Sequence, residues 1–547
     1  MKIRLILLLL FLCADLGLYA QDSAKNSYWV KLKDKSGTPF RIGRPDEFLS
    51  QRSIARRIRQ HIAIDETDLP VSPEYVDSLR NLGLEIVHTS KWLNGVTVRT
   101  ADTVLINQIA TLSFVVSVEL TKPGNLLKSA TQKFRIEDAD SEYKAADYGI
   151  AISQLTLMNG QYLHEQGYRG KGIQIAVLDA GFWHVDRLSV FDSLRTENRI
   201  LGTRDFVDPT SGFYEQHTHG MSVLSCMGGN LPGSMIGTAP DASFYLFRTE
   251  DASTEYPVEE DNWVTAAEFA DSLGVDVINS SLGYFTFDDV RMNHTYTEMD
   301  GKTIRVTQGA NMAFQKGILV FASAGNEASD SWKYIIAPAD GENILAVAAV
   351  DKNGNRASFS SVGPAFGGAV KPNVAAVGWA TYLETSAGAL GYSNGTSFSS
   401  PVLAGMGACL LQANPLADVQ QLKMAIEQSA SQYSTPDSLL GFGIPDFEKA
   451  DQYLKIRNLD ALENGNTFVA SPNPFQNYLF VQNLNPVSGI DGLLSIYNLQ
   501  GVQLWQSTFK TSDPVFWENL SNLPRGFLVL KIESEGKKEV IKLVKTN

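Results

Sequence analysis

The stretch G-I-Q-I-A-V-L-D, residues 172–179, is an apolar run that ends in a carboxylate. Four similar runs follow it: S-F-Y-L-F-R (243–248), V-D-V-I-N-S-S-L-G (275–283), G-I-L-V-F-A-S-A-G-N (317–326) and I-L-A-V-A-A-V (344–350). Continuous apolar strands are typical of a parallel sheet that helices cover on both faces. We therefore predict an α/β domain over about residues 150–456. Functional groups of such sheets gather beyond the carboxyl ends of the strands.

Upstream of this domain, residues 27–120 alternate between strand-like and helical patterns. Period-two or short apolar runs predict strands, and 3.6-residue spacing predicts helices. The predicted strands are 28–33, 84–87, 95–99 and 114–120, and the predicted helices are 47–58, 72–82 and 102–112. This pattern indicates a small α+β unit.

Two further features of the N-terminal part concern its processing. The Arg-rich run R-S-I-A-R-R-I-R (52–59) could be a cleavage site or the solvated face of a helix, and we favour the solvated face. The connector 121–147 is polar, with few large apolar residues, which is typical of an exposed segment open to proteolysis.

The end of the chain, residues 461–547, is β-rich. Short strands are predicted at 471–481, 493–501 and 526–533, with turns between them. We predict a small separate β-sandwich.

The first twenty residues carry Lys2 and Arg4, then a short apolar run, then Ala20. This layout predicts a secretory signal peptide, and the run is too short for a good membrane span. We therefore expect an exported protein with no transmembrane span in the mature chain. After removal of residues 1–20, only Cys226 and Cys409 remain, which could pair in an oxidising compartment or be buried free thiols.

Composition narrows the class of protein. The chain has 547 residues, 44% of them hydrophobic and 19% charged, which fits several soluble globular domains. Its formal net charge of −14 argues against nucleic acid as a partner, because phosphate neutralisation needs clustered Lys and Arg.

Four polar residues stand at the ends of apolar elements in the α/β domain. Asp179 ends the first strand, His219 opens an apolar segment, Asn326 follows a later strand, and Ser397 precedes a helical run. Each alone has an ordinary structural interpretation as a turn residue or helix cap. Together they supply a nucleophile, a base, a carboxylate that orients the base and an amide donor for an oxyanion.

The motifs around these residues resemble those of the subtilisin family (subtilase) of serine peptidases, in the same order and with similar spacing. The resemblance covers about residues 148–456 and is carried by V-L-D-A-G (177–181), H-G-M-S-V-L-S (219–225), V-I-N-S-S-L-G (277–283), A-S-A-G-N-E (322–327) and N-G-T-S-F-S-S-P-V-L-A-G (394–405). It implies a subtilisin-like parallel sheet covered by helices.

The resemblance also implies roles for single residues. Asp179 would orient the imidazole, His219 would act as general base and acid, and Ser397 would attack the scissile carbonyl. The side chain of Asn326 and the backbone N–H of Ser397 would hold the oxyanion. His217 falls out of register with the family motif and is expected to be a loop residue near the site.

Two positions depart from the family pattern, and five more are expected to contact substrate. Met221 stands where a small hydroxyl residue is usual, and Phe398 stands where Met is frequent, which affects the shape of the site more than its chemistry.

The resemblance implies substrate contacts at Ser281, Leu282, Gly283, Ala324 and Gly325. The first three would pair with the substrate backbone as an added strand. The last two would border a pocket roomy enough for a large apolar side chain before the cut.

The loop 249–263 is crowded with carboxylates and lies, by the resemblance, near the more distant substrate subsites. It could be a solvated acidic loop, which we favour, or it could attract basic residues of the substrate. The chemistry needs no cofactor. Family members often bind structural calcium, although no calcium loop is readable in this sequence.

The flanking units also resemble known domains. Residues 27–120 are similar to the family's inhibitory pro-domains, which assist folding and occupy the active-site cleft as an intramolecular inhibitor, so that 121–147 becomes the processing linker. Residues 461–547 resemble the sorting domain of type IX secretion substrates, on the motifs S-P-N-P-F (471–475), I-Y-N-L-Q-G (496–501) and N-L-P-R-G-F-L-V-L-K-I (522–532). Type IX secretion machinery is therefore an expected partner, and the protein is expected to be extracellular or attached to the outer cell surface.

The sequence thus favours a secreted serine endopeptidase, made as a zymogen, that cleaves proteins or peptides through an acyl-enzyme. One alternative is a catalytically inactive surface adhesin or binding protein on the same scaffold, against which the intact set of four residues argues. Another is a serine hydrolase that does not act on peptides, which the peptide-pairing segment disfavours.

Overall fold

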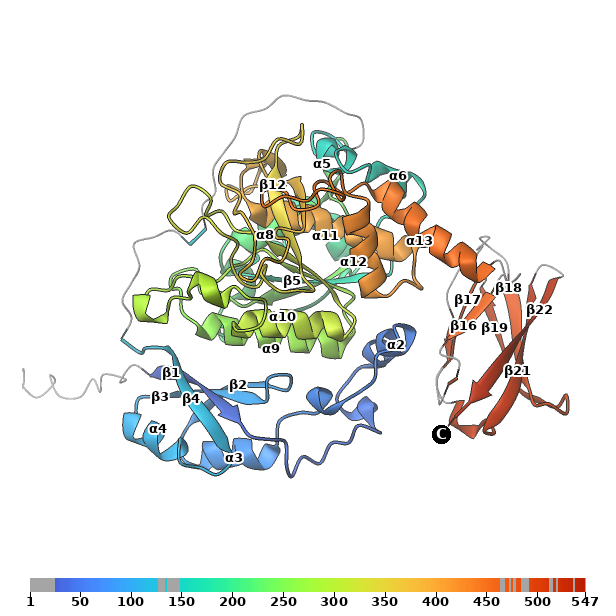
Figure 1. Ribbon diagram of the computed structural model, residues 1–547, viewed down its shortest axis with the longest axis horizontal. Helices are drawn as coiled ribbons and strands as arrows, with labels where there is room; N and C mark the ends of the chain where they lie inside the picture. Colours follow the sequence, from blue (N-terminus) through green and yellow to red (C-terminus); the bar gives the residue numbers. More distant parts are fainter. Residues whose placement is uncertain are drawn as a thin grey trace, which may run out of the picture.

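A computed structural model of the chain is shown in Figure 1. It describes residues 25–125, 133–134, 148–462, 468–471, 474–475, 479–483, 491–510, 515–517, 520–534 and 537–546. The predicted signal peptide and most of the predicted linker lie outside the described residues.

The centre of the molecule is a seven-stranded parallel sheet with the strand order β13-β12-β11-β10-β5-β9-β6. Its strands are β5 (Gln174–Asp179), β6 (Ile200–Asp205), β9 (Ser243–Arg248), β10 (Val277–Ser280), β11 (Leu319–Ser323), β12 (Leu345–Val350) and β13 (Val374–Val377). The predicted parallel sheet is confirmed. The sequence had not indicated β6, an edge strand with several exposed residues, or the four-residue β13.

Helices cover both faces of this sheet (Figure 1). On one face lie α8 (His219–Gly228) and α11 (Thr396–Ala413), and on the other lie α9 (Val258–Leu273) and α10 (Arg305–Gln315). Successive residues of a strand therefore enter different cores: Val177 packs in the core beneath α8 and α11, and Leu178 in the core beneath α9 and α10. Burial on both faces explains why the strands are continuously apolar.

The N-terminal unit is a four-stranded antiparallel sheet with the order β2-β3-β1-β4. Its elements are β1 (Asn26–Leu32), α2 (Gln51–Arg59), α3 (Pro73–Asn81), β2 (Glu85–Ser90), β3 (Gly95–Thr100), α4 (Thr103–Ile109) and β4 (Val115–Lys122), close to the predicted α+β pattern. Helices α3 and α4 lie on one side of the sheet, and the other side packs against α9 (Figure 1). Trp29 and Trp92 join the core of the central domain there.

The interpretation of the Arg-rich run as a solvated helix face is wrong. Arg56 and Arg57 in α2 are each 1% exposed. Both guanidinium groups contact the carboxylate of Asp271 in α9, at 2.5 and 2.7 Å. The helical spacing was visible in the sequence, but the second domain against which this helix docks was not.

The C-terminal unit consists of two antiparallel sheets that share one core, in agreement with the predicted β domain. One sheet has the order β16-β17-β20 and the other β19-β18-β21-β22. The strands are β16 (Phe468–Ser471), β17 (Leu479–Asn483), β18 (Asp491–Tyr497), β19 (Gln503–Lys510), β20 (Val515–Trp517), β21 (Gly526–Ser534) and β22 (Lys537–Lys545). Helix α13 (Phe447–Leu462) leads into this unit (Figure 1).

Two expectations about the chain as a whole can be compared with the structure. Within the described residues, no helix is both long and apolar enough to cross a membrane. Cys226 and Cys409 are free thiols, each buried in the core beneath α8 and α11. Burial raises the pKa of both thiols, so both stay protonated.

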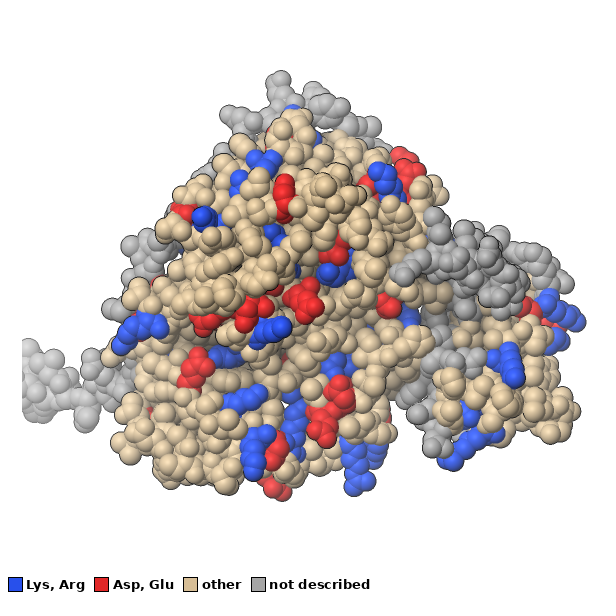
Figure 2. Space-filling model, viewed as in Figure 1, with Lys and Arg blue, Asp and Glu red and all other residues tan. Residues whose placement is uncertain are grey.

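On the viewed face of the described residues, Lys and Arg are interspersed with Asp and Glu (Figure 2).

Candidate active site

Asp179 and His219 meet at the carboxyl edge of the central sheet. Asp179 is the last residue of β5, and His219 is the first residue of α8. The His219 Nδ1 and Asp179 Oδ1 atoms lie 2.7 Å apart, and both side chains are buried. Gly220 makes this approach possible, because a Cβ at that position would lie 2.6 Å from the carbonyl oxygen of Gly181. The His-Gly pair therefore lets α8 begin directly above the carboxylate.

Ser397 lies in the first turn of α11, where backbone N–H groups have no partner within the helix. Pro401, four residues later, has no N–H to give to the Ser397 carbonyl. The hydroxyl of Ser281 donates to that carbonyl instead, at 2.7 Å. Asn279 continues this buried network, since its amide donates to Ser281 Oγ at 3.0 Å and its Oδ1 accepts from Ser400 Oγ at 2.8 Å. Side chains from β10 and the residue after it thus fix the start of the helix.

The Ser397 hydroxyl is not aimed at the imidazole in this conformation. It donates to the carbonyl oxygen of Ser281 at 3.3 Å, and a hydroxyl has only one proton to donate. The ring of Phe134, from the predicted linker, lies over His219 with its centroid 4.3 Å from that of the imidazole. The same ring is 4.9 Å from His217. The linker therefore covers the candidate base.

Asn326 is bound through its side-chain oxygen to Thr396, the residue before Ser397. The backbone N–H of Thr396 can only donate, and it lies 2.9 Å from Asn326 Oδ1. The hydroxyl of Thr396 donates to the same oxygen at 3.0 Å. The assignment of Oδ1 leaves Nδ2 as a donor on the side chain that lines the cleft beside Ser397. Gly325, with φ of 108°, provides the left-handed backbone that turns Asn326 out of the sheet.

His217 lies beside the pair without replacing His219. Its Nδ1 accepts the backbone N–H of His219 at 3.2 Å. Burial, together with the neighbouring His219, lowers the pKa of His217 to about 4. A neutral imidazole that accepts a backbone hydrogen bond is a structural element of the loop, in keeping with the sequence-based expectation.

These groups border a cleft of about 350 Å³. Of the five predicted substrate contacts, Ser281, Leu282, Gly283 and Gly325 line it. Ala324 is buried beside Gly325, in a small apolar cluster. The two departures from the family pattern, Met221 and Phe398, are also buried, at 0% and 1% exposure, in the core beneath α8 and α11.

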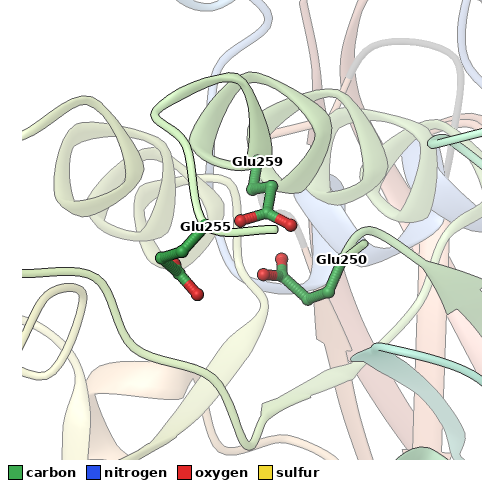
Figure 3. A group of neighbouring side chains, drawn as sticks. All are labelled: Glu250, Glu255 and Glu259. Carbon is green, nitrogen blue, oxygen red and sulfur yellow. The ribbon is translucent and has the colours of Figure 1, made fainter. Parts of the chain in front are cut away.

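The acidic loop contributes a compact group of three carboxylates to the cleft region. Glu250 follows β9, Glu255 lies in the loop, and Glu259 is in the first turn of α9, and one oxygen of each lies within 4.8 Å of the others. Figure 3 shows these three side chains together. Glu250 and Glu259 are buried, at 0% and 1% exposure, which contradicts the interpretation of this loop as a solvated acidic face.

Among the described residues, Glu250, Glu255 and Glu259 form the one group of three or more His, Cys, Asp or Glu side chains close enough to share a metal ion. Calcium takes six to eight oxygen ligands. Here the Nζ atom of Lys133 lies 2.7 to 2.8 Å from each of the three carboxylates. With the linker in this position, the group does not fit a calcium ion.

Sequence analysis missed four contributors to this region: Lys133 and Phe134 of the linker, and Asn279 and Thr396 in the network around Ser397. The run V-I-N-S-S (277–281) contained a signal for Asn279, because a polar amide at the end of an apolar strand needs a partner. For Lys133 and Phe134 the sequence contained no comparable signal.

Models of three known protein families match parts of the chain. A model of the subtilase family (peptidase S8) matches residues 170–443. The chain belongs to the subtilase family. A model of the peptidase S8 propeptide domain of Bacteroidota matches residues 27–136, and a model of the secretion system C-terminal sorting domain matches residues 470–546. The protein is therefore a subtilisin-like serine peptidase with a propeptide and a sorting domain that implies secretion.

Among its relatives are several subtilisins. Subtilisin DY of Bacillus licheniformis is 29% identical over 287 residues, which cover 52% of this chain and 91% of the relative. Subtilisin NAT of Bacillus subtilis subsp. natto is 30% identical over 312 residues, which cover 56% of this chain and 72% of the relative. The subtilisin of Bacillus pumilus is 30% identical over 296 residues, covering 53% and 94%.

Proposed function

We propose that this subtilase is a secreted serine endopeptidase that cleaves proteins or peptides through an Asp179–His219–Ser397 triad. The observation that carries the proposal is the 2.7 Å hydrogen bond between buried Asp179 and His219 Nδ1, while Ser397 lies in the first turn of α11. This bond fixes the imidazole so that Nδ1 carries the proton and Nε2 is left as the base.

In the proposed reaction, His219 Nε2 removes the proton of Ser397 as Oγ bonds to the scissile carbonyl carbon. The resulting oxyanion accepts hydrogen bonds from Asn326 Nδ2 and from the backbone N–H of Ser397. His219 then gives its proton to the leaving amine, the C–N bond breaks, and an acyl-enzyme remains. Water, deprotonated by the same imidazole, releases the acid product.

The first step requires two changes from the conformation described above. Phe134 must leave the imidazole, and the Ser397 hydroxyl must turn from the Ser281 carbonyl toward His219. We therefore propose that residues 27–120 act as an intramolecular inhibitor whose linker is cut to give the active enzyme. Proteins and peptides are the proposed substrates, and type IX secretion machinery is the proposed partner of the C-terminal unit. The product would be extracellular or attached to the outer cell surface.

The chemistry as proposed requires no cofactor, because proton transfer and oxyanion binding are both supplied by side chains and backbone. Calcium, where bound, would have a structural role. Exhaustive treatment with EDTA should then change thermal stability but leave kcat of the folded enzyme unchanged.

The test compares the secreted chain with Ser397→Ala in hydrolysis of casein, together with labelling by a serine-directed phosphonate and intact-mass analysis. Proteolysis that is lost in the variant, with one adduct on Ser397, supports the proposal. Neither cleavage nor adduct after removal of the N-terminal unit would instead indicate a catalytically inactive binding or surface protein.

A second variant tests the oxyanion donor. Asn326→Gly should lower kcat by about 10²- to 10³-fold, with little change in substrate binding, as expected for one lost donor. An unchanged kcat would remove Asn326 from the mechanism.

A further inference from the structure

The pocket formed by Glu250, Glu255 and Glu259 is unusual because it concentrates negative charge away from water. Glu250 and Glu259 are buried, and the side chain of Glu255 is 18% exposed. Like charges at this separation disfavour one another, and burial adds to the cost. Burial raises the pKa of Glu255 to about 7 and raises that of Glu259 as well. A cation bound among the three carboxylates would therefore stabilise their ionised forms.

Lys133 of the linker supplies this cation. Its Nζ atom is 2.8 Å from Glu250, 2.8 Å from Glu255 and 2.7 Å from Glu259, and its side chain is only 13% exposed. Burial opposes the charge on Lys133, but the three carboxylates outweigh burial and raise its pKa well above the usual value. The residue that fills the pocket thus comes from outside the catalytic unit.

Two of the three carboxylates are held by groups of the catalytic unit. The hydroxyl of Tyr284 donates to Glu250 Oε1 at 2.5 Å, and the backbone N–H of Asp251 donates to Glu259 Oε1 at 2.8 Å. These bonds direct the second oxygen of each carboxylate, Oε2, toward the ammonium of Lys133. Glu250 and Glu259 therefore keep these partners when the linker is cut away, while the loop loses the bonds from Lys122 to Asp251 and Thr254.

The pocket and the catalytic groups belong to one cleft. Glu250 and Glu255 line the same cavity as Ser397 and Asn326. The residue after Lys133 is Phe134, whose ring covers His219. A peptide that places a lysine in the pocket therefore brings its neighbouring residue to the catalytic imidazole.

The geometry points to a lysine-selective substrate subsite formed by Glu250, Glu255 and Glu259, which Lys133 occupies in the unprocessed chain. This inference rests on the proposed function and names a side chain that the enzyme selects in its substrates. An ammonium has three N–H donors, one for each carboxylate. The planar guanidinium of arginine presents a fork of donors that does not match three acceptors around one point.

The first experiment uses the self-processed secreted protein and the decapeptide S-A-T-Q-K-F-R-I-E-D, the sequence of residues 129–138. The peptide is compared with versions that carry norleucine or arginine in place of the lysine, each as a competitor of a chromogenic peptide substrate. The inhibition constant should rise by about 30-fold or more with norleucine, because the carboxylates lose their charged partner. Arginine should be weaker than lysine and stronger than norleucine.

Enzyme variants separate the pocket from general attraction by negative charge. In Glu259→Gln, the ratio of the inhibition constants of the norleucine and lysine peptides should fall about tenfold. If this variant fails to fold, the more exposed Glu255→Gln replaces it. The matched control is Asp330→Asn, an exposed carboxylate on the wall of the same cleft. Its ratio should stay within about twofold, since exposed charges are screened.

A second experiment needs no catalysis. In the full Ser397→Ala chain, Lys133 should be acetylated by an amine-reactive ester at least about tenfold more slowly than exposed Lys171, as read by mass spectrometry, because a buried paired ammonium rarely offers its free amine. Glu259→Gln in the same background should remove this protection, and Asp330→Asn should not.

The outcomes separate the two proposals. Lysine preference together with protection of Lys133 supports the subsite. Protection without any preference among the peptides overturns it and leaves a pocket that only holds the linker. A lysine preference that millimolar calcium abolishes would also overturn it, and would assign the pocket to a metal ion in the mature enzyme. If the phosphonate does not label Ser397 and no substrate is cut, the proposed function fails and the subsite falls with it, while the acetylation result stands as a property of the zymogen.

Discussion

Two places where cations of the N-terminal segment meet carboxylates of the catalytic unit differ in their arrangement. At the docking face, Arg56, Arg57 and Lys91 surround the single carboxylate of Asp271 in α9, at 2.5 to 3.0 Å. In the Glu250–Glu255–Glu259 pocket, the ratio is reversed, with one lysine among three carboxylates. At Asp271 the cations outnumber the carboxylate, although Arg57 also pairs with Asp68 of its own unit at 3.0 Å, whereas in the pocket the carboxylates outnumber the cation.

This difference indicates two kinds of recognition. Asp271 pairs with three cations of one particular domain. It loses these partners once that domain leaves. The pocket is built by the catalytic unit itself and accepts a single side chain, which any peptide can supply. The first arrangement suits a dedicated inhibitor, and the second suits a substrate.

The largest effect is expected from Asp271→Asn. Removal of one partner from a buried ionic cluster costs about 3–5 kcal/mol, because it leaves Arg56 buried without its carboxylate partner and Arg57 with Asp68 alone. In the full Ser397→Ala chain, hydrogen exchange of the amides of α2 and β2 should accelerate by about 100-fold or more. The control is Asp77→Asn, which removes an exposed pair with Arg80 and should change the rate by less than about fivefold. Equal rates in both variants would show that the docking face does not depend on its ion cluster.

A smaller effect is expected from Lys91→Met. Lys91 is one of three cations around Asp271, and its backbone N–H also donates to Glu268 at 2.7 Å, a bond that the variant keeps. Loss of one charge-assisted bond among several should raise the same exchange rates by about tenfold. An effect as large as that of Asp271→Asn would mean that Lys91 alone holds the domain.

Changes in pH should separate the two regions. Burial, partly offset by Lys133, raises the pKa of Glu255 to about 7. Because Lys133 acts to lower this pKa, the binding of Lys133 is coupled to the loss of a proton from Glu255. The charged groups facing Glu255 are Lys133, Glu250, Glu259 and Asp288. Protection of Lys133 relative to Lys171 should therefore increase as the pH rises from about 7 toward 9.

At Asp271, burial opposes ionisation, but Lys91, Arg57 and Arg56 hold the pKa of this carboxyl below its usual range. Docking should accordingly be insensitive to pH in this window and be lost only in strong acid. If both regions opened together between pH 9 and 6, the distinction between them would be refuted.

Much of the architecture could be predicted from local patterns. The strand that ends at Asp179 is visible as an apolar run because both faces of the sheet are covered, and five of its seven strands show this pattern. Edge strand β6 escaped notice because half-exposed residues interrupt its apolar pattern. In the candidate site, Asp179 and His219 lie together as the motifs predicted.

The sequence by itself determined the fold class, the order of the units and the residues available for chemistry, because periodicity and residue type act over a few neighbouring positions. Only the tertiary structure decided three other features: the burial of Arg56 and Arg57, the bond from Ser281 that replaces the one Pro401 cannot make, and the capture of Lys133 by three carboxylates. Each depends on charges or hydrogen bonds between segments far apart in the chain. Such pairings are set by the free energy of removing groups from water together, which no local pattern records.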